Sequence, residues 1–346
     1  SLRSYAMNAW TDNTTQAYNG LKTIAEDAFS CVNLTTIDLP STLETVGDFA
    51  FSGCDYIEMF NIGDNLKPFS NWVIWNSKIK SFNVSENNNY YQSIEGDLYS
   101  KDGKTLIAYA NGKEQTSYKV SNIVTTIGTY AFCYSNLENI EISDSVTTIE
   151  EYAFSYNNKL KDIKFSENLK IIQAYAFGGC SNLVSVTLPN SLETIEKYAF
   201  ISCSELISVY IGDNTASISP YAFYCENLKL INISKNNQYF STIDGNVYSK
   251  DGTVLYIYAT GKDSKNFTVP DHVTTIKEGA IWVHKKLRTI IIPKNVTVVE
   301  KNAIYDIVYY LEVYCEASKK PSGYESKWIN YQNKLDVKIV WGYTGE

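Results

Sequence analysis

The sequence predicts a solenoid in which short β-strands and tight or 3₁₀ turns form about ten stacked coils of 22 or 23 residues. The stretch Leu183–Cys203 keeps neither the helical period of 3.6 nor the strand period of 2 for more than a few residues, so the unit must turn corners within itself. The unit recurs at a nearly fixed spacing, which is typical of repeat architectures. A single coil cannot bury its own apolar side, so neighbouring coils must cover it.

The repeat is tracked through the position that Phe200 occupies. In chain order this position holds Phe29, Phe51, Ile74, Phe132, Phe154, Phe177, Phe200, Phe223, Ile281 and Ile304. The steps from Ile74 to Phe132 and from Phe223 to Ile281 are 58 residues long, which equals one coil of 23 plus 35. We therefore expect two ordinary coils that each carry a 35-residue insert, near residues 85–119 and 234–268.

Each coil is expected to contain two short strands and a corner. In the unit above, Val186 and Leu188 alternate with polar residues and indicate a first strand. Leu192 and Ile195 begin a second extended piece on the opposite wall, and the Tyr-Ala-Phe sequence that ends at Phe200 turns the corner in a tight or 3₁₀ turn.

The two inserts are copies of one another. Residues 85–113 align without a gap to residues 234–262, and both contain an acidic residue before Gly and then Lys-Asp-Gly between short apolar runs. These patterns are typical of tight hairpin turns. We expect a small three-stranded β-meander that loops out of the coil.

The ends of the chain are expected to cover the end coils. Residues 1–20 show no repeat match and are interpreted as the remnant of an N-terminal cap; residues 21–315 form the solenoid, and residues 316–346, with Trp328 and Trp341, form a C-terminal cap. The chain begins at Ser1 without a basic and apolar leader, so we expect no signal peptide in this sequence.

Composition argues against several classes of function. The formal net charge is -8, whereas a nucleic-acid surface needs clustered Lys and Arg, so no nucleic-acid partner is expected. No window holds 18 consecutive apolar residues, so no membrane insertion is expected.

Chemistry-bearing motifs are absent from the sequence. The seven cysteines lack paired C-x-x-C spacing and are interpreted as buried wall residues rather than disulfides or metal ligands. The two histidines, His272 and His284, fall in one late unit beside charged residues and are interpreted as surface residues. We expect no enzyme activity, cofactor or metal, although two carboxylates brought together by coiling cannot be recognised from the sequence.

Outward positions of the first strands provide candidate binding residues. Apolar or aromatic residues interrupt these otherwise polar columns, and such side chains are where binding anchors tend to lie. The candidates are Met59, Lys164, Tyr210, Leu230, Ile291 and Tyr314. Isolated exposed hydrophobic residues are also ordinary on protein surfaces.

A tyrosine precedes Ala-Phe in five consecutive units, at Tyr130, Tyr152, Tyr175, Tyr198 and Tyr221. Stacked rings on a repeating wall would stabilise contacts between neighbouring coils. Tyrosine is also a favoured contact residue of protein-binding surfaces. We expect the packing role first, with binding as the alternative.

The spaced pattern L-x-x-I-x-L-P-x-x-L-x-x-I-x-x-x-A-F-x-x-C, seen at Leu183–Cys203, and the D-G-x-x-Y-S-K-D-G insert resemble the BspA-type leucine-rich repeat over about residues 21–315. This resemblance implies a right-handed leucine-rich-repeat solenoid, α/β by convention, on a bacterial cell-surface or secreted protein. It also implies a role in adhesion to host matrix or cell-surface proteins. The Trp-rich unit at Ile74 and the replacement of Phe by Ile281 and Ile304 depart from the pattern.

We therefore expect a non-catalytic, monomeric protein-binding or adhesion module that is extracellular or on the cell surface. Two alternatives remain: a structural spacer or stalk of a larger surface protein, and a glycan-binding module that uses exposed Tyr and Asn.

Overall fold

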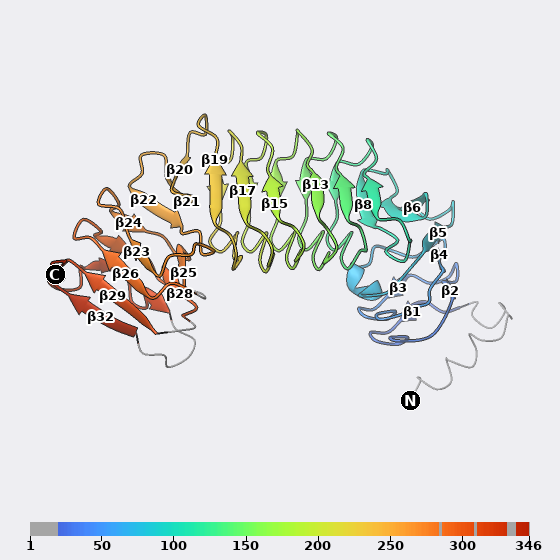
Figure 1. The fold of residues 1–346 in the computed structure, drawn as a ribbon. Helices are drawn as coiled ribbons and strands as arrows, with labels where there is room; N and C mark the ends of the chain where they lie inside the picture. The colour runs from blue at the N-terminus through green and yellow to red at the C-terminus, as the bar shows by residue number, and fades with distance from the viewer. Residues whose placement is uncertain (1–19, 284–285, 308–309, 331–336, 346) are drawn as a thin grey trace.

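The computed structural model describes residues 20–283, 286–307, 310–330 and 337–345. Within these residues the chain forms 32 short strands and one 3₁₀ helix, η1 (Asn71–Ile74). The strands stack coil upon coil into an arch, with the two ends bent toward the same side (Figure 1). The predicted solenoid is thus confirmed, and the predicted N-terminal cap remnant lies outside the described residues except for Gly20.

The first strands of successive coils form one wall of the solenoid. Most neighbours within this wall pair in parallel, as Ser185 does with Ser208, and the wall is divided into four sheets. The wall consists of β2 (Thr36–Asp38), β4 (Met59–Ile62), β5 (Ser81–Val84), β9 (Ser117–Lys119), β11 (Asn139–Glu141), β13 (Asp162–Lys164), β15 (Ser185–Thr187), β17 (Ser208–Ile211), β19 (Leu230–Ile233), β23 (Asn266–Thr268), β26 (Thr289–Ile292), β29 (Leu311–Cys315) and β32 (Val337–Trp341).

The second strands form the opposite wall. They are β1 (Thr23–Ile24), β3 (Thr45–Val46), β8 (Thr105–Ala108), β10 (Thr126–Ile127), β12 (Thr148–Ile149), β14 (Ile171–Ile172), β16 (Thr194–Ile195), β18 (Ser217–Ile218), β22 (Val254–Ile257), β24 (Thr275–Ile276), β27 (Val298–Val299) and β30 (Gly323–Tyr324). Three corner strands, β25 (Ile281–Trp282), β28 (Ile304–Tyr305) and β31 (Ile329–Asn330), pair beside them near the C-terminus.

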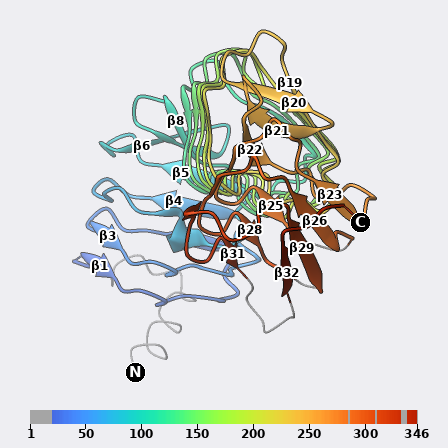
Figure 2. The same ribbon diagram turned by 90° about the vertical axis from the view of Figure 1, so that its left-hand side faces the viewer.

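The core is a single file of rings down the solenoid axis. Phe154, Phe177 and Phe200 are fully buried, and their ring centroids lie 5.0 Å apart from one to the next, with nearly parallel planes. The amide of Phe177 donates to the carbonyl of Ala199 in the next coil at 2.7 Å, so each ring is held in register by the backbone. Figure 2, which looks along the arch, shows the central coils superposed on one another.

The two inserts form the antiparallel meanders that the sequence predicts, but these do not loop out of the coil. Strands β6 (Tyr91–Ile94) and β7 (Asp97–Ser100) form a hairpin with β8, and β20 (Phe240–Ile243) and β21 (Asn246–Ser249) form one with β22. The third strand of each meander pairs in parallel with the next ordinary coil, as Leu106 does with Ile127. Each 35-residue segment is therefore a coil of the solenoid itself.

Tyr109 and Tyr258 take the place of Phe in these insert coils. The Tyr109 ring stacks on that of Phe132, with centroids 5.3 Å apart, and the Tyr109 amide donates to the carbonyl of Ala131. Tyr258 makes the same amide contact to Ala280. With these two insert coils counted, twelve coils run from Phe29 to Ile304, which is roughly consistent with the expectation of about ten.

A buried asparagine fixes the start of each hairpin. Asn237 has no solvent exposure; its amide nitrogen donates to the carbonyls of Gly212 and Thr215, while its oxygen accepts from the amides of Tyr239 and Phe240. Asn88 makes the same four contacts in the first insert. Since buried polar groups need partners, only Asn at this position satisfies both donors and acceptors of the bend.

The insert coils have a shorter corner than the other coils. In an ordinary coil Phe132 comes five positions after the strand residue Ile127. In the first insert coil Tyr109 comes only three positions after Leu106, which pairs with Ile127. The two missing residues are those that carry the corner tyrosine elsewhere. The hairpin adds two strands on the opposite side of the same coil. Each insert coil is therefore thin at its corner and thick on the hairpin side, and we call it a wedge.

The wedges bend the solenoid into an arch. Across the first, the side-chain amide nitrogen of Asn71 donates to the carbonyl of Thr129 at 2.7 Å, although these residues belong to coils two positions apart. Across the second, the rings of Tyr221 and Tyr305 meet edge to face at 4.7 Å. The corners therefore lie on the inner side of the arch, where η1, β25 and β28 are seen, and the hairpins on its outer side (Figure 1).

The strand columns continue beyond Cys315, where the sequence pattern stops. Strands β30, β31 and β32 pair in parallel with β27, β28 and β29 of the preceding coil. Trp328 is buried against this coil, and Trp341 packs on it from the side. Residues 316–341 thus supply strands for one more coil; whether they protect the last coil stays a prediction.

All seven cysteines are free thiols, and six are buried as expected. Cys31 is the exception: it is exposed and lies two residues after Phe29 with a positive φ of 57°. Burial raises the pKa of the Cys133 thiol to about 12, which leaves it protonated and unreactive.

Candidate binding surfaces

The structure places the six predicted binding residues at separate points along the first-strand wall. Met59 is 42% exposed on β4, while Tyr210 and Leu230 are each 38% exposed, on β17 and β19. Leu230 pairs with Ser208, two residues before Tyr210, so these two are diagonal neighbours. Lys164, on β13, forms an ion pair with Glu141 across the strands at 3.1 Å.

Ile291 and Tyr314 are direct neighbours in register on β26 and β29, and Val340 of β32 follows Tyr314. Both are only partly exposed. The structure therefore brings together two pairs among the six residues and leaves Met59 and Lys164 apart from them.

The corner tyrosines form a continuous ladder on the inner side of the arch. Ring centroids lie 4.8 Å apart from Tyr130 to Tyr152, 4.7 Å to Tyr175, 5.0 Å to Tyr198 and 5.4 Å to Tyr221. All five rings are partly exposed. Their stacking supports the packing role, and their exposure leaves the binding role available.

Backbone conformation fixes this ladder. Each of the five tyrosines has a positive φ, between 55° and 62°, a region that residues with a β-carbon rarely adopt. The left-handed residue reverses the chain at the corner and points its side chain away from the buried Phe two residues later. The burial of each ring raises the pKa of its hydroxyl, so the ladder presents neutral phenol groups.

Further aromatic rings extend the ladder at both ends. At the first wedge Trp72 lies 5.1 Å from Tyr130, and Trp75 lies 5.2 Å from Tyr134. At the second wedge Tyr224 contacts Trp282 and Tyr305. We name the whole set the aromatic strip: Trp72, Trp75, Tyr130, Tyr134, Tyr152, Tyr156, Tyr175, Tyr198, Tyr221, Tyr224, Trp282 and Tyr305.

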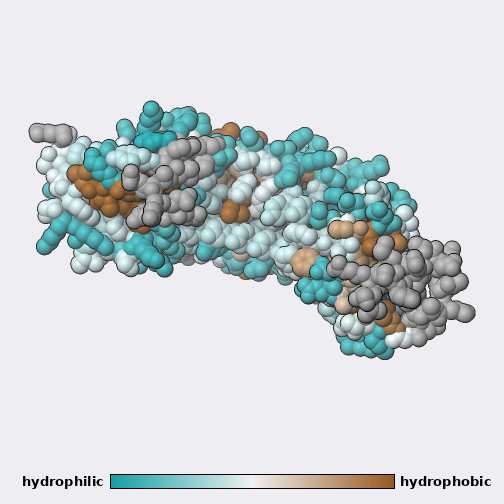
Figure 3. All heavy atoms as spheres, turned by 90° about the horizontal axis from the view of Figure 1, so that it is seen from below, coloured by the Kyte–Doolittle hydropathy of each residue, from teal (hydrophilic) through white to brown (hydrophobic). Residues whose placement is uncertain are grey.

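Seen from the inner side, the central part of the arch is mostly pale, the shade of residues with intermediate hydropathy, rather than brown (Figure 3). Tyr and Trp combine a large apolar ring with a polar group, so a surface rich in them is amphipathic. Such a surface suits reversible contact with a partner better than permanent burial.

A groove of about 300 Å³ opens where the tyrosine ladder ends at Tyr221. The next left-handed corner residues are Gly279 and Asn302, so no ring continues the ladder. A β-carbon at Gly279 would lie 3.0 Å from the Tyr221 ring, which shows how closely the chain passes there. The groove is lined by Lys197, Tyr198, Tyr221, Tyr224, Glu278, Asn302, Tyr305, Asp306 and Asn330.

The tyrosine ladder was predictable from the sequence, whereas the groove was not. The groove combines corners from coils around Tyr198, Tyr221, Gly279 and Asn302, and the short insert coil between them brings these corners together. A signal was present, since the tyrosine column stops at Tyr221 and is replaced by Gly279 and Asn302.

The described residues contain no group of three or more His, Cys, Asp or Glu side chains that could hold a metal ion. Within the same residues no helix is long and apolar enough to cross a membrane. His272 contacts the Tyr248 ring at 6.0 Å, while His284 lies outside the described part of the chain.

Stacked coils of two short parallel strands and a left-handed corner, around a file of Leu, Ile, Val and Phe, define a leucine-rich-repeat solenoid. The family model described as the BspA type leucine rich repeat region matches residues 2–97, 125–251 and 255–318 in six copies. Because the match covers most of the chain, the protein belongs to the BspA-type leucine-rich repeat family, as its motifs indicated.

Several solved structures are similar to this chain, and the first of those that follow, with a TM-score above 0.5, shows the same fold. The pneumococcal vaccine antigen PcpA is 20% identical, with a TM-score of 0.53 over 92% of this chain and 71% of that protein. A leucine-rich repeat protein from Eubacterium ventriosum is 23% identical over 66% of this chain and 80% of its own, with a TM-score of 0.44. A leucine rich cell surface protein from Faecalibacterium prausnitzii is 15% identical over 75% of this chain and 97% of its own, with a TM-score of 0.41. None of the curated proteins compared has a significantly similar sequence.

Proposed function

We propose that this protein is a non-catalytic recognition module of a bacterial cell-surface or secreted protein, and that it binds a host matrix or cell-surface protein through the inner side of the arch. The aromatic strip carries the proposal. Its rings from Trp72 through the tyrosine ladder to Tyr221 are partly exposed, and each contacts the next, whereas the six wall residues form two separate pairs and two isolated positions. Tyr and Trp are the residues most enriched at the centres of protein interfaces.

Membership of the BspA-type family and the likeness of fold to a bacterial vaccine antigen support a position outside the cell. The shape of the arch also supports the proposal, because a curved inner side offers an extended surface to one partner. The leucine-rich-repeat solenoid is typically a non-catalytic scaffold.

Binding to a panel of immobilised extracellular-matrix proteins tests the proposal. Replacement of Tyr152 and Tyr175 by Ala should lower affinity for the bound protein by at least about tenfold, since central aromatic anchors contribute about 2 kcal/mol or more. A matched control is Tyr239→Ala, because Tyr239 is exposed in the second hairpin, outside the aromatic strip. Thermal unfolding of each variant separates lost contacts from lost structure.

The same assay with Ile291→Ser and Tyr314→Ala tests the first-strand wall as the interface. Loss of binding in these variants, with the tyrosine variants unaffected, would move the binding surface to the wall. Absence of binding to the whole panel would contradict adhesion and favour a spacer that holds another domain away from the cell.

A further inference from the structure

The groove at the end of the tyrosine ladder contains two carboxylates without a basic partner. Glu278 accepts a hydrogen bond from the Tyr221 hydroxyl at 3.3 Å. Asp306 accepts from the Tyr224 hydroxyl and, at 2.9 Å, from the indole nitrogen of Trp282. No Lys or Arg among the described residues forms an ion pair with either carboxylate, although Lys277, beside Glu278, pairs with Glu300.

Neutral donors leave most of each carboxylate free for a ligand. Burial raises the pKa of both the Tyr221 and the Tyr224 hydroxyl, so each remains a protonated donor beside its carboxylate. A carboxylate has about four acceptor positions, of which these contacts use one or two. The groove therefore keeps acceptor capacity and negative charge that these contacts leave unused.

The rings of the groove already hold a cation. The ammonium nitrogen of Lys197 lies 4.9 Å from the centroid of the Tyr198 ring and 5.2 Å from that of Tyr221. These are cation–π distances, and they show that this wall attracts positive charge. Glu278 and Asp306 still outnumber Lys197, in a protein whose net charge is -8.

We infer that this groove binds a basic side chain of a partner protein, with arginine as the best fit. A guanidinium is flat, stacks on aromatic rings and donates in parallel to a carboxylate, which matches rings and carboxylates placed side by side. A volume of about 300 Å³ accommodates one long side chain rather than a folded element. The inference rests on the proposed protein-binding function and adds the chemistry of one anchor on the partner.

Titration with a small probe tests the inference without the partner. The probe is N-acetyl-arginine methylamide, its neutral match is N-acetyl-citrulline methylamide, and the signal is the indole N–H resonance of Trp282, which donates to Asp306. We expect the arginine probe to shift this resonance in a saturable way in the millimolar range, and the citrulline probe to have at least about tenfold weaker binding.

Two variants test whether charged side chains of the groove determine the affinity for the arginine probe. Glu278→Gln should weaken binding of the arginine probe about tenfold or more, since it removes one of the two unpaired carboxylates. Lys197→Ala should strengthen binding, because it removes the competing positive charge; a merely structural role of Lys197 would not change affinity in this direction. Glu141→Gln, on the first-strand wall, is the matched control and should have no effect on the probe.

Other results would overturn the inference. Equal shifts with the citrulline probe, or binding of methyl glycosides without binding of the arginine probe, would make the groove a neutral polar or sugar site. No shift with any probe would exclude a basic ligand here. The probe assay needs no matrix protein, so the two proposals can fail separately. Binding of the arginine probe without binding of any matrix protein would reject only the proposed function. Binding of a matrix protein without binding of the probe would reject only this inference.

Discussion

The amide nitrogen of Gly261 lies 2.7 Å from the carbonyl oxygen of Leu228 in the preceding coil. A β-carbon on Gly261 would lie 2.2 Å from the backbone carbonyl carbon of Asn227, so these two backbone segments touch and leave no room for a side chain. Gly112, its counterpart in the first insert, meets the carbonyl of Lys78 in the same way. These glycines let the backbone pass this closely beside the shortened corners.

Gly261→Ala and Gly112→Ala should therefore each destabilise the protein by about 1–3 kcal/mol or more, because the added methyl group forces the two backbones apart. Urea unfolding measures the loss. Gly178→Ala is the control and should cost less, since its nearest contacts would be a methyl group of Ile201 and the carbonyl oxygen of Tyr175, both at 3.2 Å. Equal losses at all three positions would show that the corners of the insert coils are not specially tight.

The buried asparagines of the two hairpins provide a second test. Asn237→Ala leaves two carbonyls and two amides without their partner, and unsatisfied buried groups cost about 1–3 kcal/mol each, so the loss should exceed that of most surface changes. Asn236→Ala, one residue earlier and exposed, is the matched control. Unfolding midpoints that shift equally for both variants would contradict the anchoring role of Asn237.

Alanine substitution should lower the stability of the protein more in the file of core phenylalanine rings than in the tyrosine ladder. Phe177 is fully buried between Phe154 and Phe200, so Phe177→Ala should cost about 3–5 kcal/mol through loss of transfer energy and a residual cavity. Tyr175→Ala, two residues away and partly exposed, should cost clearly less. If the tyrosine variant were as unstable as the phenylalanine variant, the ladder would be chiefly a packing element.

The spacing of Phe residues was enough to predict the solenoid, its strands and its core file. It missed two coils because these carry Tyr109 and Tyr258 where the others carry Phe or Ile. The Ala108-Tyr109 pair could have indicated the first of these coils, because it occupies the place of Ala-Phe. The hairpin pattern around it favoured a separate insert instead.

The arch and the groove could not be predicted from the repeat. Both result from contacts between coils that are not immediate neighbours, such as Trp72 with Tyr130, two coils apart, and Tyr221 with Tyr305, three coils apart. A repeat pattern describes the contacts of a coil with its immediate neighbours. The shortening of the corner between Leu106 and Tyr109 by two residues becomes visible only once strand register is known.

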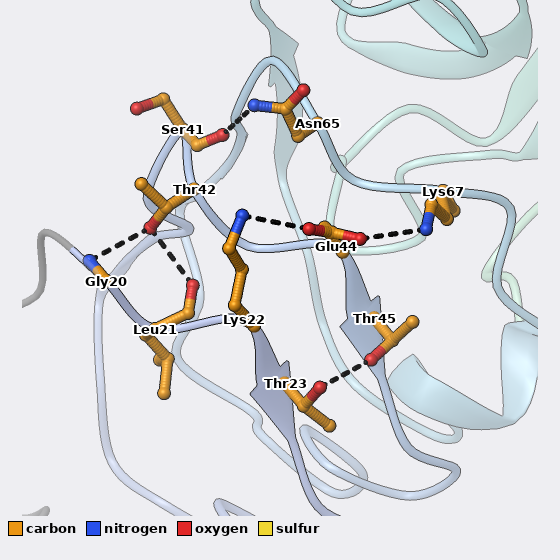
Figure 4. A network of polar contacts seen from close by, with 10 residues as sticks. All are labelled: Gly20, Leu21, Lys22, Thr23, Ser41, Thr42, Glu44, Thr45, Asn65 and Lys67. Atoms are coloured by element: carbon orange, nitrogen blue, oxygen red, sulfur yellow. Dashed lines mark hydrogen bonds and ion pairs between the residues drawn. The ribbon is translucent and has the colours of Figure 1, made fainter.

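Acid sensitivity provides the last test, through ion pairs that link successive coils. Glu44 accepts from the ammonium groups of Lys22 in the coil before and Lys67 in the coil after, at 2.8 Å each (Figure 4). These two hydrogen-bonded lysines lower the pKa of Glu44 to about 2, from 4.5 in the absence of such partners. Since the folded pKa is the lower one, Glu44 contributes stability above pH 4.5 that is lost as the pH falls toward 2.

Glu44→Gln should accordingly lower the free energy of unfolding at neutral pH and make its decline toward about pH 3 shallower than in the unmodified protein. The effect should be small and should shrink at high salt, because the pair is exposed and screened. Glu86→Gln is the control, since the Glu86 side chain forms no ion pair with any described residue, and its curve should run parallel to that of the unmodified protein. Urea unfolding at several pH values measures both curves; a Glu44→Gln curve that also runs parallel would show that this ladder of charges adds nothing to the stacking of the coils.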